Sequence, residues 1–513
     1  MLHRWAFARS LTILLFCLGC VVQVPQPVLH DAPRGELPAI TASVLKVHHR
    51  SGALDVMRDF RLDGDSILEG MSDRYSPRRE FLNTATVRIP VDSIALLESN
   101  DPTIGFSLGL AAMVLYTGAS AFVAGVCLAD PKSCFGSCPT FYLEPGLHGR
   151  PVAEGFSSSI ARILEATDVD DLRAVRAAGT SVDLWMRNEA RETHAIRHVR
   201  LHAVPVEQGE EVRRLAAGGY RIVRTLEAAT ACRARGGDCT RAVAPADTTA
   251  WRDLSESDDL ASPDTMLLEF APTGGEAALL LEARQTFIST FVLYQSMAWF
   301  GTTVGDWLAN LERGDPIALR SLAAVDRAIG QIRVEQESAD GSWRAIGVFA
   351  EAGPIATDAQ LFPVTTLGAG PVRLRLISAR GGWRIASAAL ATLAPTRAAV
   401  VLEPVRAVRE AGSGGDALAL LMDPGKHLIA LPGDVTKLTF VVPADAPHYA
   451  LFLVSRGYYY EWMRQEWLAE EDATLARVLL DDPRTALRLL APGYKAREAS
   501  FEQNFWASRF TAR

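Results

Sequence analysis

The stretch VRLRLISARGGWRI, residues 372–385, decides the fold class, because two alternating segments flank a Gly-Gly turn. Apolar and basic residues alternate over 372–376 and again over 383–385. A period of two puts one set of side chains on the buried face of a strand and the other set toward solvent. Residues 343–348 repeat the pattern, and Gly and Pro separate the segments. This spacing predicts an antiparallel β-sandwich of jelly-roll-like character.

The same alternation extends in both directions from this stretch. It predicts a small β domain over 41–100, either a barrel or a half-sandwich, a β-rich domain over 131–270 and the sandwich over 271–457. From Tyr458 onward the apolar residues recur at helical spacing, so residues 458–513 are expected to be C-terminal helices. The predicted class is therefore mainly β with a helical C-terminus (α+β).

The N-terminal residues carry a pattern that is typical of an export signal. Basic residues precede an apolar run over 11–18, and Gly19-Cys20 closes that run. This arrangement resembles a bacterial lipoprotein signal peptide, although Cys17 stands where such signals usually have Leu. The resemblance implies that residues 1–19 are removed, that Cys20 carries lipid, and that residues 20–40 form a Pro-rich tether. Val21 follows the cysteine in place of the Asp that retains lipoproteins at the inner membrane, so the resemblance favours the outer membrane.

The net charge of the chain argues against some classes of binding partner. There are 60 acidic and 52 basic side chains in 513 residues, for a formal net charge of −8. Loss of Arg4 and Arg9 with the signal peptide would make the mature chain more acidic still. This balance argues against binding to nucleic acid and against electrostatic docking on anionic lipid.

The cysteines of an exported chain are expected to form disulfides. Cys232 and Cys239 flank a polar turn with a Gly pair, and we predict that they are bonded to each other. Cys134 and Cys138 are predicted to form a structural disulfide, either with each other or with Cys127, and an odd cysteine remains. A zinc or redox site at these three positions is the less favoured alternative, because the spacing offers no second ligand pair and no Cys-x-x-Cys. No metal and no cofactor are therefore predicted.

A second apolar run covers residues 102–129, which contain no charged side chain between Asp101 and Asp130. Its length is that of a membrane span. A single span would place Cys232 and Cys239 in the reducing cytoplasm, so a helical hairpin over 101–130, buried or dipping into the membrane, is the alternative. Residues 285–305 also contain no charged side chain, and they are expected to form a buried strand-to-helix element.

Other residue patterns suggest chemistry only weakly. His194, His198 and His202 recur every four residues, which would stack metal ligands on a helix. The alternation of Val199, Leu201 and Ala203 favours a strand instead, and along a strand the outer two histidines lie roughly 26 Å apart. The acidic run 168–171 could ligate calcium but lacks the spacing of an EF-hand loop. A Walker loop and a His-Glu-x-x-His motif are both absent from the sequence.

The segment CFGSCPTFY at 134–142, with RNEARETH at 187–194 downstream, resembles bacterial envelope proteins that carry a CxxxCPT-Y motif and have no assigned activity. The likeness extends to residues 458–467. It implies a structural, disulfide-bearing module and no catalytic residue.

Three functions remain in view from the sequence. The favoured one is a lipid-anchored envelope protein, held to the membrane through Cys20, that binds an envelope protein or a glycan or serves as a scaffold without catalysis. The first alternative is an envelope hydrolase acting on glycan or peptide, which a pair of acidic side chains in a deep cleft would favour. A shallow sandwich face with exposed aromatic side chains would favour binding. The second alternative is an integral membrane component that uses residues 102–129.

Overall fold

The computed structural model describes residues 23–30, 44–104 and 139–500, apart from short gaps at 50, 52, 64–65, 76–80, 145–150, 191, 246–249, 351–352, 367–369, 396, 412–414 and 462–464. The chain divides into two compact units. The first comprises Met1–Leu128 and Arg464–Glu470, and the second comprises Ala129–Met463 and Glu471–Arg513. The signal peptide 1–19, Cys20, Cys127, Cys134, Cys138 and the apolar residues 105–129 lie outside the described residues.

The first unit holds a six-stranded antiparallel sheet in the order β1-β6-β2-β3-β4-β5. Its strands are β1 (Gln23–His30), β2 (Val44–His49), β3 (Leu54–Asp63), β4 (Ile67–Tyr75), β5 (Phe81–Pro90) and β6 (Ile94–Ile104). Alternate residues of these strands, among them Leu45, Val47, Met57 and Leu97, form a buried apolar cluster. The short strands expected over 41–100 are therefore present.

Three details of that region differ from the sequence-based expectation. The sheet runs from β1 at one edge to β5 at the other rather than closing into a small barrel. Residues 23–30 of the expected tether form β1, which pairs with β6 despite Pro25 and Pro27. Residues 101–104, expected at the start of an apolar helix, continue β6. Proline is tolerated at an edge strand, and this explains how β1 joins the sheet.

The second unit contains a β-sandwich, but its strands come from residues 140–206 and 400–461 and not from the stretch 372–385 whose alternation predicted it; that stretch belongs to two other sheets. One sheet has the order β24-β26-β10-β7-β8 and the other has β23-β11-β27-β9, with β25 paired to β11. The bounds are β7 (Thr140–Tyr142), β8 (Ala153–Glu154), β9 (Ala166–Ala177), β10 (Ser181–Arg187), β11 (Glu192–Val206), β23 (Val400–Leu402), β24 (Arg406–Ala411), β25 (Leu428–Ala430), β26 (Val435–Val441) and β27 (His448–Glu461).

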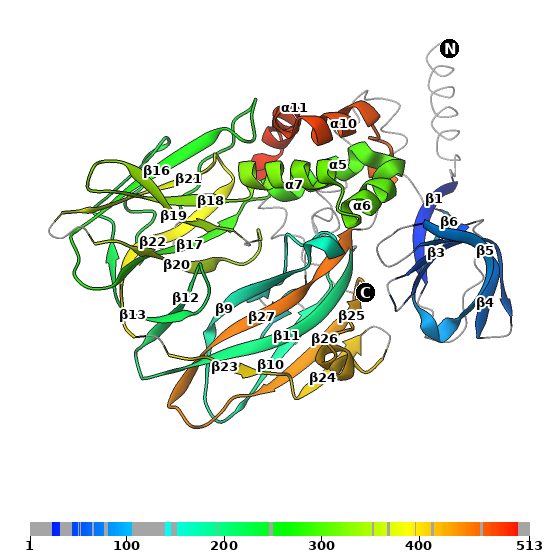
Figure 1. Cartoon of the computed structure of the whole chain (residues 1–513), viewed down its shortest axis with the longest axis horizontal. Coiled ribbons are helices and arrows are strands. Elements are labelled where there is room, and N and C mark those ends of the chain that lie inside the picture. Colours follow the sequence, from blue (N-terminus) through cyan, green and yellow to red (C-terminus); the bar gives the residue numbers. More distant parts are fainter. Residues whose placement is uncertain are drawn as a thin grey trace, which may run out of the picture. The chain divides into compact units, whose positions relative to one another are not determined.

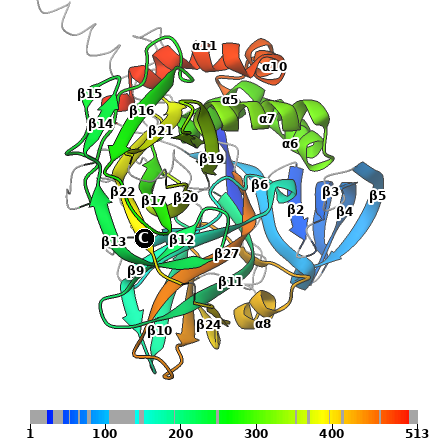
Figure 2. The ribbon, with the colours of Figure 1, turned by 60° about the vertical axis from the view of Figure 1, so that its left-hand side comes forward.

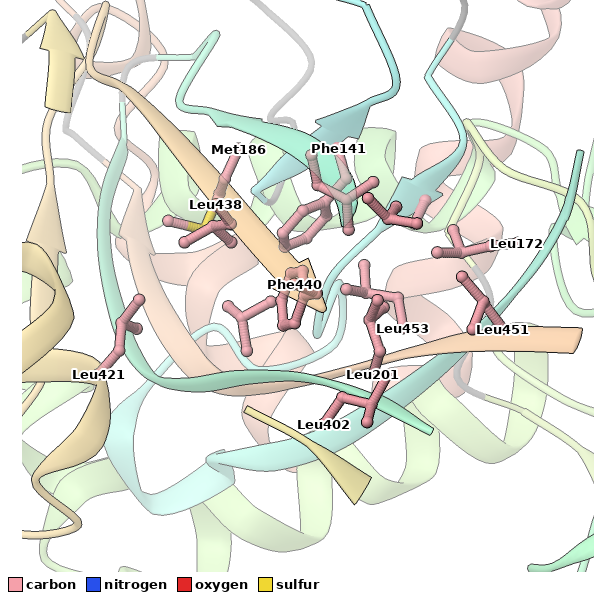
Figure 3. Packing of buried hydrophobic residues seen from close by; sticks show 14 of the residues in the cluster. Phe141, Leu172, Met186, Leu201, Leu402, Leu421, Leu438, Phe440, Leu451 and Leu453 are labelled. Carbon is pink, nitrogen blue, oxygen red and sulfur yellow. The ribbon is translucent and has the colours of Figure 1, made fainter. Parts of the chain in front are cut away.

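Both sheets of the sandwich contribute to one hydrophobic core. Phe141, Met186 and Phe440 come from the first sheet. Leu201 and Leu453 come from the second, and Figure 3 shows these side chains pointing toward one another between the strands. Full burial of each such side chain stabilises the fold by roughly 1.5–3 kcal/mol, so this core holds the two sheets together.

A five-stranded closed barrel and a further sheet complete the β structure of the second unit. The barrel has the order β12-β13-β22-β17-β20, and the six-stranded sheet has β15-β14-β16-β21-β18-β19. Their bounds are β12 (Glu211–Leu215), β13 (Tyr220–Ala228), β14 (Ala231–Ala234), β15 (Gly237–Asp238), β16 (Pro263–Phe270), β17 (Ala277–Gln285), β18 (Ile332–Glu337), β19 (Trp343–Phe349), β20 (Asp358–Val364), β21 (Val372–Ala379) and β22 (Trp383–Leu393). The opening stretch 372–385 thus forms β21, a turn with Gly381 at positive φ, and the start of β22, but the two strands lie in different sheets: β21 pairs with β16 and β18, and β22 pairs with β13 and β17.

A layer of helices packs beside these sheets, as Figures 1 and 2 show. It comprises α5 (Ile288–Phe300), α6 (Val304–Glu312), α7 (Pro316–Ile329), α10 (Ala473–Asp481) and α11 (Pro483–Lys495). Helix α8 (Ala417–Met422) lies between β24 and β25 in the chain, and α9 (Gln465–Leu468) belongs to the first unit. Asp315 and Asp482 cap α7 and α11, and each is followed by Pro at the first helical position. Both choices favour a helix start.

Two expectations about the helices have different outcomes. The buried strand-to-helix element over 285–305 is confirmed, because β17 ends at Gln285 and α5 is buried on most of its surface. The helical start at Tyr458 is wrong: β27 continues to Glu461, and α11 runs through Pro492 instead of ending there. Pairing with β11 across its full length keeps the end of β27 extended.

The fold class, mainly β with a helical C-terminus, is confirmed. The boundary expected at 270/271 does not separate sheets, because β10 pairs with β26 and β11 pairs with β27 across it. Among the described residues, none of the helices combines the length and apolar character needed to cross a bilayer.

Candidate functional site

The second unit contains a cavity of about 200 Å³ beside α5 and α7. Its wall comes from α5, α6 and α7, from Leu479 of α10, from the 157–160 segment, from Glu154 of β8 and from the end of β27. Most of the lining is apolar, with Val292, Leu293 and Ile329 as examples. The helices are tied to one another at this place by Ser321 Oγ, which donates to Leu479 O at 2.7 Å. The cavity is therefore formed by ordered helices and a strand end.

Two buried carboxylates line the cavity. Glu154 is 3 % exposed and Glu461 is 8 % exposed. Glu154 Oε2 accepts a hydrogen bond from Ile355 N at 2.9 Å, which orients the carboxylate. Gly353 makes room for it, because a Cβ at that position would lie 2.3 Å from Glu154 Oε2. A third acid, Asp326, lines the cavity from α7 and is exposed, so it lies toward the rim.

The strand register places a Glu–His pair beside these carboxylates. Glu192 lies opposite Glu461, and His194 lies opposite Tyr459, in the β11–β27 ladder. Side chains of directly opposed residues point to the same face, with Cβ atoms about 5 Å apart. His194 Nε2 is 2.9 Å from Glu192 Oε2, and both residues are fully buried. Acid and base side chains are thus grouped next to one wall of the cavity.

Aromatic and hydroxyl side chains complete the lining. Tyr294, Trp307 and Tyr459 are each less than 9 % exposed. Tyr459 OH donates to Ser157 O at 3.0 Å, so the ring is held in one position. Trp307 stacks on Phe300 at 5.0 Å between ring centroids. The cavity can therefore offer both ring surfaces and hydrogen-bond acceptors to a small molecule.

The acidic run 168–171 lies on β9 and contributes no residue to the cavity lining, although Asp170 accepts a hydrogen bond from the backbone of Glu154, which does line it. Burial raises the pKa of Asp170 well above its usual value, and the neighbouring charges of Asp168 and Asp358 raise it further. Asp171 is paired instead with Arg173 at 3.2 Å and Arg213 at 3.7 Å. In the part of the chain that the structure describes, no three His, Cys, Asp or Glu side chains form a group that could hold a metal ion.

The three histidines do not form a site. All of them lie on strand β11, as the alternation of apolar residues indicates. A register irregularity between Ile196 and His198 shifts the faces, so that both Ile196 and Val199 reach the sandwich core. His194 is consequently buried, while His202 hydrogen-bonds Tyr220 OH at 2.8 Å on the barrel side. A one-residue bulge explains the change, because it moves the following side chains to the opposite face.

The predicted bond between Cys232 and Cys239 is confirmed as a disulfide with a Cα–Cα distance of 5.0 Å. Both cysteines belong to the apolar cluster that the barrel shares with the six-stranded sheet. This disulfide joins β14 to the segment after β15, where Cys239 N donates to Cys232 O at 3.1 Å. The disulfide therefore stabilises the packing between the barrel and the sheet that contains β14.

The sequence reasoning did not single out Glu154 or Glu461 as site residues. One signal was present: Glu192 and His194 occupy inward positions of a strand whose other inward residues are apolar. A charged side chain at such a position is uncommon without a partner. The exposed aromatic side chains that would favour binding at a sandwich face are missing among the described residues, whose exposed large apolar side chains are all aliphatic.

The comparisons with known proteins yield no relative. No protein-family model matches the chain, and no curated protein matches its sequence. A secreted serine protease, VesC from Vibrio cholerae, is similar over 73 % of this chain and 84 % of its own, with 8 % identity and a TM-score of 0.16. A structure of infectious bursal disease virus, Gt strain, is similar over 72 % and 86 %, with 11 % identity and a TM-score of 0.14. Scores this low carry no argument about fold or function.

Proposed function

We propose that this is a lipid-anchored cell-envelope protein, held through Cys20, whose second unit binds a small ligand in the cavity beside α5 and α7 without catalysing its conversion. The cavity carries this proposal. Its largely apolar lining with a few buried polar groups is what small-molecule sites commonly have. The resemblance of residues 1–20 to a lipoprotein signal supports the anchor, and the disulfide between Cys232 and Cys239 fits an oxidising compartment.

The size of the cavity favours a small ligand over a polymer. An apolar cavity of about 150 Å³ is enough for benzene. At about 200 Å³ the present cavity accommodates a ring with one polar substituent, and a glycan or peptide chain would extend far beyond it. A protein or glycan partner of the envelope would therefore bind elsewhere on the surface.

A cavity-filling variant tests ligand binding. Ser289 lines the cavity from α5 and is half-buried, so Ser289→Phe would occupy the space without disturbing the core. The matched control is Ile317→Phe, at a position on α7 that is 45 % exposed. Small ring compounds should raise the melting temperature of the wild type and of the control, and should not raise that of Ser289→Phe. Equal shifts in all three proteins would refute binding in this cavity.

Membrane fractionation tests the anchor. The Cys20→Ala variant should leave the membrane fraction while keeping the fold. If it stays as tightly bound as the wild type, the lipid is not the anchor, and residues 102–129 become the best explanation for membrane attachment. That result would favour the integral-membrane alternative.

A hydrolase remains the second candidate, because Glu461 lines the cavity and lies in register with Glu192 beside His194. General acid–base catalysis needs carboxyl or imidazole groups of this kind in contact with a substrate. The substrate would have to be small or to enter by one end only. Slow turnover of small glycosides or peptide esters that is lost in Glu461→Gln would establish this alternative over simple binding.

A further inference from the structure

Basic side chains gather on the outer face of the sandwich sheet that contains β11 and β27. His198 and Arg200 alternate along β11 with residues of the sandwich core, so their side chains point away from that core. Strand β27 runs beside β11 (Figure 1), and Arg456 lies directly opposite His198. Directly opposed side chains share one face of a sheet, with Cβ atoms about 5 Å apart. Three basic groups therefore lie together, in a chain whose formal net charge is −8.

Basic side chains also converge on one carboxylate at this place. Glu165, directly before β9, accepts hydrogen bonds from Arg197 Nε and, at 2.7 Å, from Arg197 Nη2. Its Oε1 atom lies 3.4 Å from Arg456 Nε and 3.6 Å from His427 Nε2. The fold thus directs basic side chains from β11, β27 and the segment before β25 toward one oxyanion. The residues that we call the basic patch are Arg197, His198, Arg200 and Arg456.

The carboxylates next to the basic patch do not balance its arginines. Arg197, Arg200 and Arg456 carry three positive charges. Their described ion pairs involve two acids, Glu165 and Glu403, the latter 2.7 Å from Arg200 Nε. Arg200 is 39 % exposed and Arg456 is 37 % exposed, so both side chains are open to solvent. One positive charge therefore remains for an anion from outside.

The titration of His198 reflects this excess of positive charge. Burial lowers the pKa of His198, and the charges of Arg200 and Arg456 lower it further, to about 4. Glu165 acts in the opposite direction and Arg197 in the same direction as the other arginines. The nearby carboxylate therefore does not cancel the positive potential at the ring. An anion bound beside the ring would favour its protonated form and raise its pKa.

We propose that the basic patch binds a phosphoryl group. This site is separate from the cavity beside α5 and α7, so the proposal goes beyond the function proposed for that cavity. A phosphoryl group carries nearly two negative charges at neutral pH and has three acceptor oxygens. It can therefore meet donors from three side chains at once, whereas a carboxylate has two oxygens and one charge. Arginine suits this ligand because its planar fork of N–H groups matches phosphate oxygens.

Calorimetric titration of the full chain with inorganic phosphate at fixed ionic strength tests the proposal. Arg456→Gln should weaken phosphate binding about tenfold, because it removes a charged donor. Arg200→Gln should weaken it about fivefold and serves if Arg456→Gln does not fold. The matched control is Arg477→Gln, at an arginine on α10 that is 82 % exposed, and its affinity should equal that of the wild type. Absence of binding to the wild type, or equal weakening in control and test variants, would overturn the proposal.

Nuclear magnetic resonance of the His198 ring gives a readout that a purely structural role would not change. Inorganic phosphate should raise the pKa of His198 from about 4 to about 5 or higher, because the anion stabilises the charged ring. His202 lies further along β11 and hydrogen-bonds Tyr220 OH at 2.8 Å, so its titration should change less. An unchanged titration of His198 in the presence of phosphate would refute binding at this patch.

Two further probes identify the source of the phosphoryl group. Glycerol phosphate represents a soluble ester, and phosphatidylcholine vesicles that contain phosphatidic acid represent a lipid headgroup. The vesicles are tested with the full chain carrying Cys20→Ala, so that the anchor does not contribute. Binding of glycerol phosphate alone supports a soluble ester as the ligand. Sedimentation with the vesicles that is lost on adding Arg456→Gln supports a lipid headgroup, and binding to neither probe would overturn the proposal.

Discussion

Asp55 in the first unit and Asp170 in the second are both buried on β-strands, at 1 % and 8 % exposure, yet their neighbours differ. Three donors surround Asp55: His49 Nε2 is 2.6 Å away, Ser72 Oγ 2.8 Å and Arg74 Nε 3.0 Å. Asp170 lies among other acids, and Arg214, whose Nη2 bonds Asp358 at 2.9 Å, is the nearby cation.

The two pKa values move in opposite directions as a result. Burial alone would raise the pKa of Asp55, but hydrogen bonds from His49 and Ser72 and the charge of Arg74 bring it below the usual 3.8. Burial raises the pKa of Asp170, and Asp168 and Asp358 add to the increase. Burial therefore raises the pKa of both groups; the hydrogen bonds and the charge around Asp55 together outweigh it there, whereas the neighbouring acids add to it at Asp170.

The largest effect is expected from Asp55→Ala. It leaves Arg74, His49 and the buried Ser72 without their shared acceptor, and donors left without a partner in a largely buried site cost about 3 kcal/mol together. Hydrogen exchange of peptides from 44–104 would measure the loss in the first unit. Asp73→Asn is the control, because its partner Arg58 is 62 % exposed and the pair contributes little. Equal losses in the two variants would contradict the special role of Asp55.

Removal of the disulfide should have the next largest effect. It should not change the surroundings of Asp55 or of Asp170. The double variant Cys232→Ser with Cys239→Ser opens a loop with a sequence separation of 7. Chain entropy predicts a loss of about 2 kcal/mol in the free energy of unfolding of the second unit. Urea denaturation at pH 5 and pH 8 would measure it. A change in the pH dependence, rather than a uniform loss at both values, would indicate that the disulfide is coupled to the acids.

A smaller effect of opposite sign is expected from Asp170→Asn. Because the folded-state pKa of Asp170 lies above its unfolded value, the folded state binds the proton more tightly, and stability declines as pH rises from 3.8 through the folded pKa. The neutral side chain avoids that decline, so the variant should be roughly 1 kcal/mol more stable than the wild type at pH 8. The difference should shrink at pH 4.

Asp55→Asn provides the reverse case. The folded-state pKa of Asp55 is lowered, so its contribution is present above pH 3.8 and is lost as pH falls through the folded pKa. Urea denaturation from pH 3 to pH 8 should therefore separate the two asparagine variants by the sign of their slopes. Parallel slopes would show that the surroundings of the two acids are equivalent.

The smallest effect belongs to an exposed pair. Asp481 and Arg477 are 3.4 Å apart on α10, at 61 % and 82 % exposure. Exposed helix pairs of this spacing contribute about 0.3 kcal/mol. Asp481→Asn should change the urea midpoint by an amount near the limit of measurement, and a loss above 1 kcal/mol would mean that position matters more than its exposure suggests.

The sequence predicts an element of this fold well when nearby residues determine it, and poorly when a strand far away in the chain determines it. The strand at 181–187 is predicted in full, because Val182, Leu184 and Met186 are buried at alternate positions. The end of β27 is not, because Tyr458–Glu461 also fits a helical spacing and only the ladder to β11 keeps it extended. Local periodicity is the same for both readings, and the neighbouring strand selects between them.

The candidate site is predicted less well for the same reason. Glu154 and Glu461 are about three hundred positions apart in the chain, and each looks like an ordinary charged residue near the end of a strand. They line one cavity because β8 and β27 end close to α5 and α7. The spacing of residues along the chain does not show which acids will share a cavity. The sequence therefore shows many acidic residues but not which of them form the site.

By itself, the sequence determined that stretch 372–385 forms two strands, that Cys232 and Cys239 are bonded, and that a buried helix follows Gln285. Each of these depends on residues within a few positions of one another, through the period of a strand, the closure of a short loop or an uninterrupted apolar run. Only the tertiary structure decided that β10 pairs with β26, that a bulge in β11 turns His194 away from His202, and that three acids gather around one cavity. These features depend on which apolar faces pack together, and many faces of similar composition compete for that packing until the whole chain is folded.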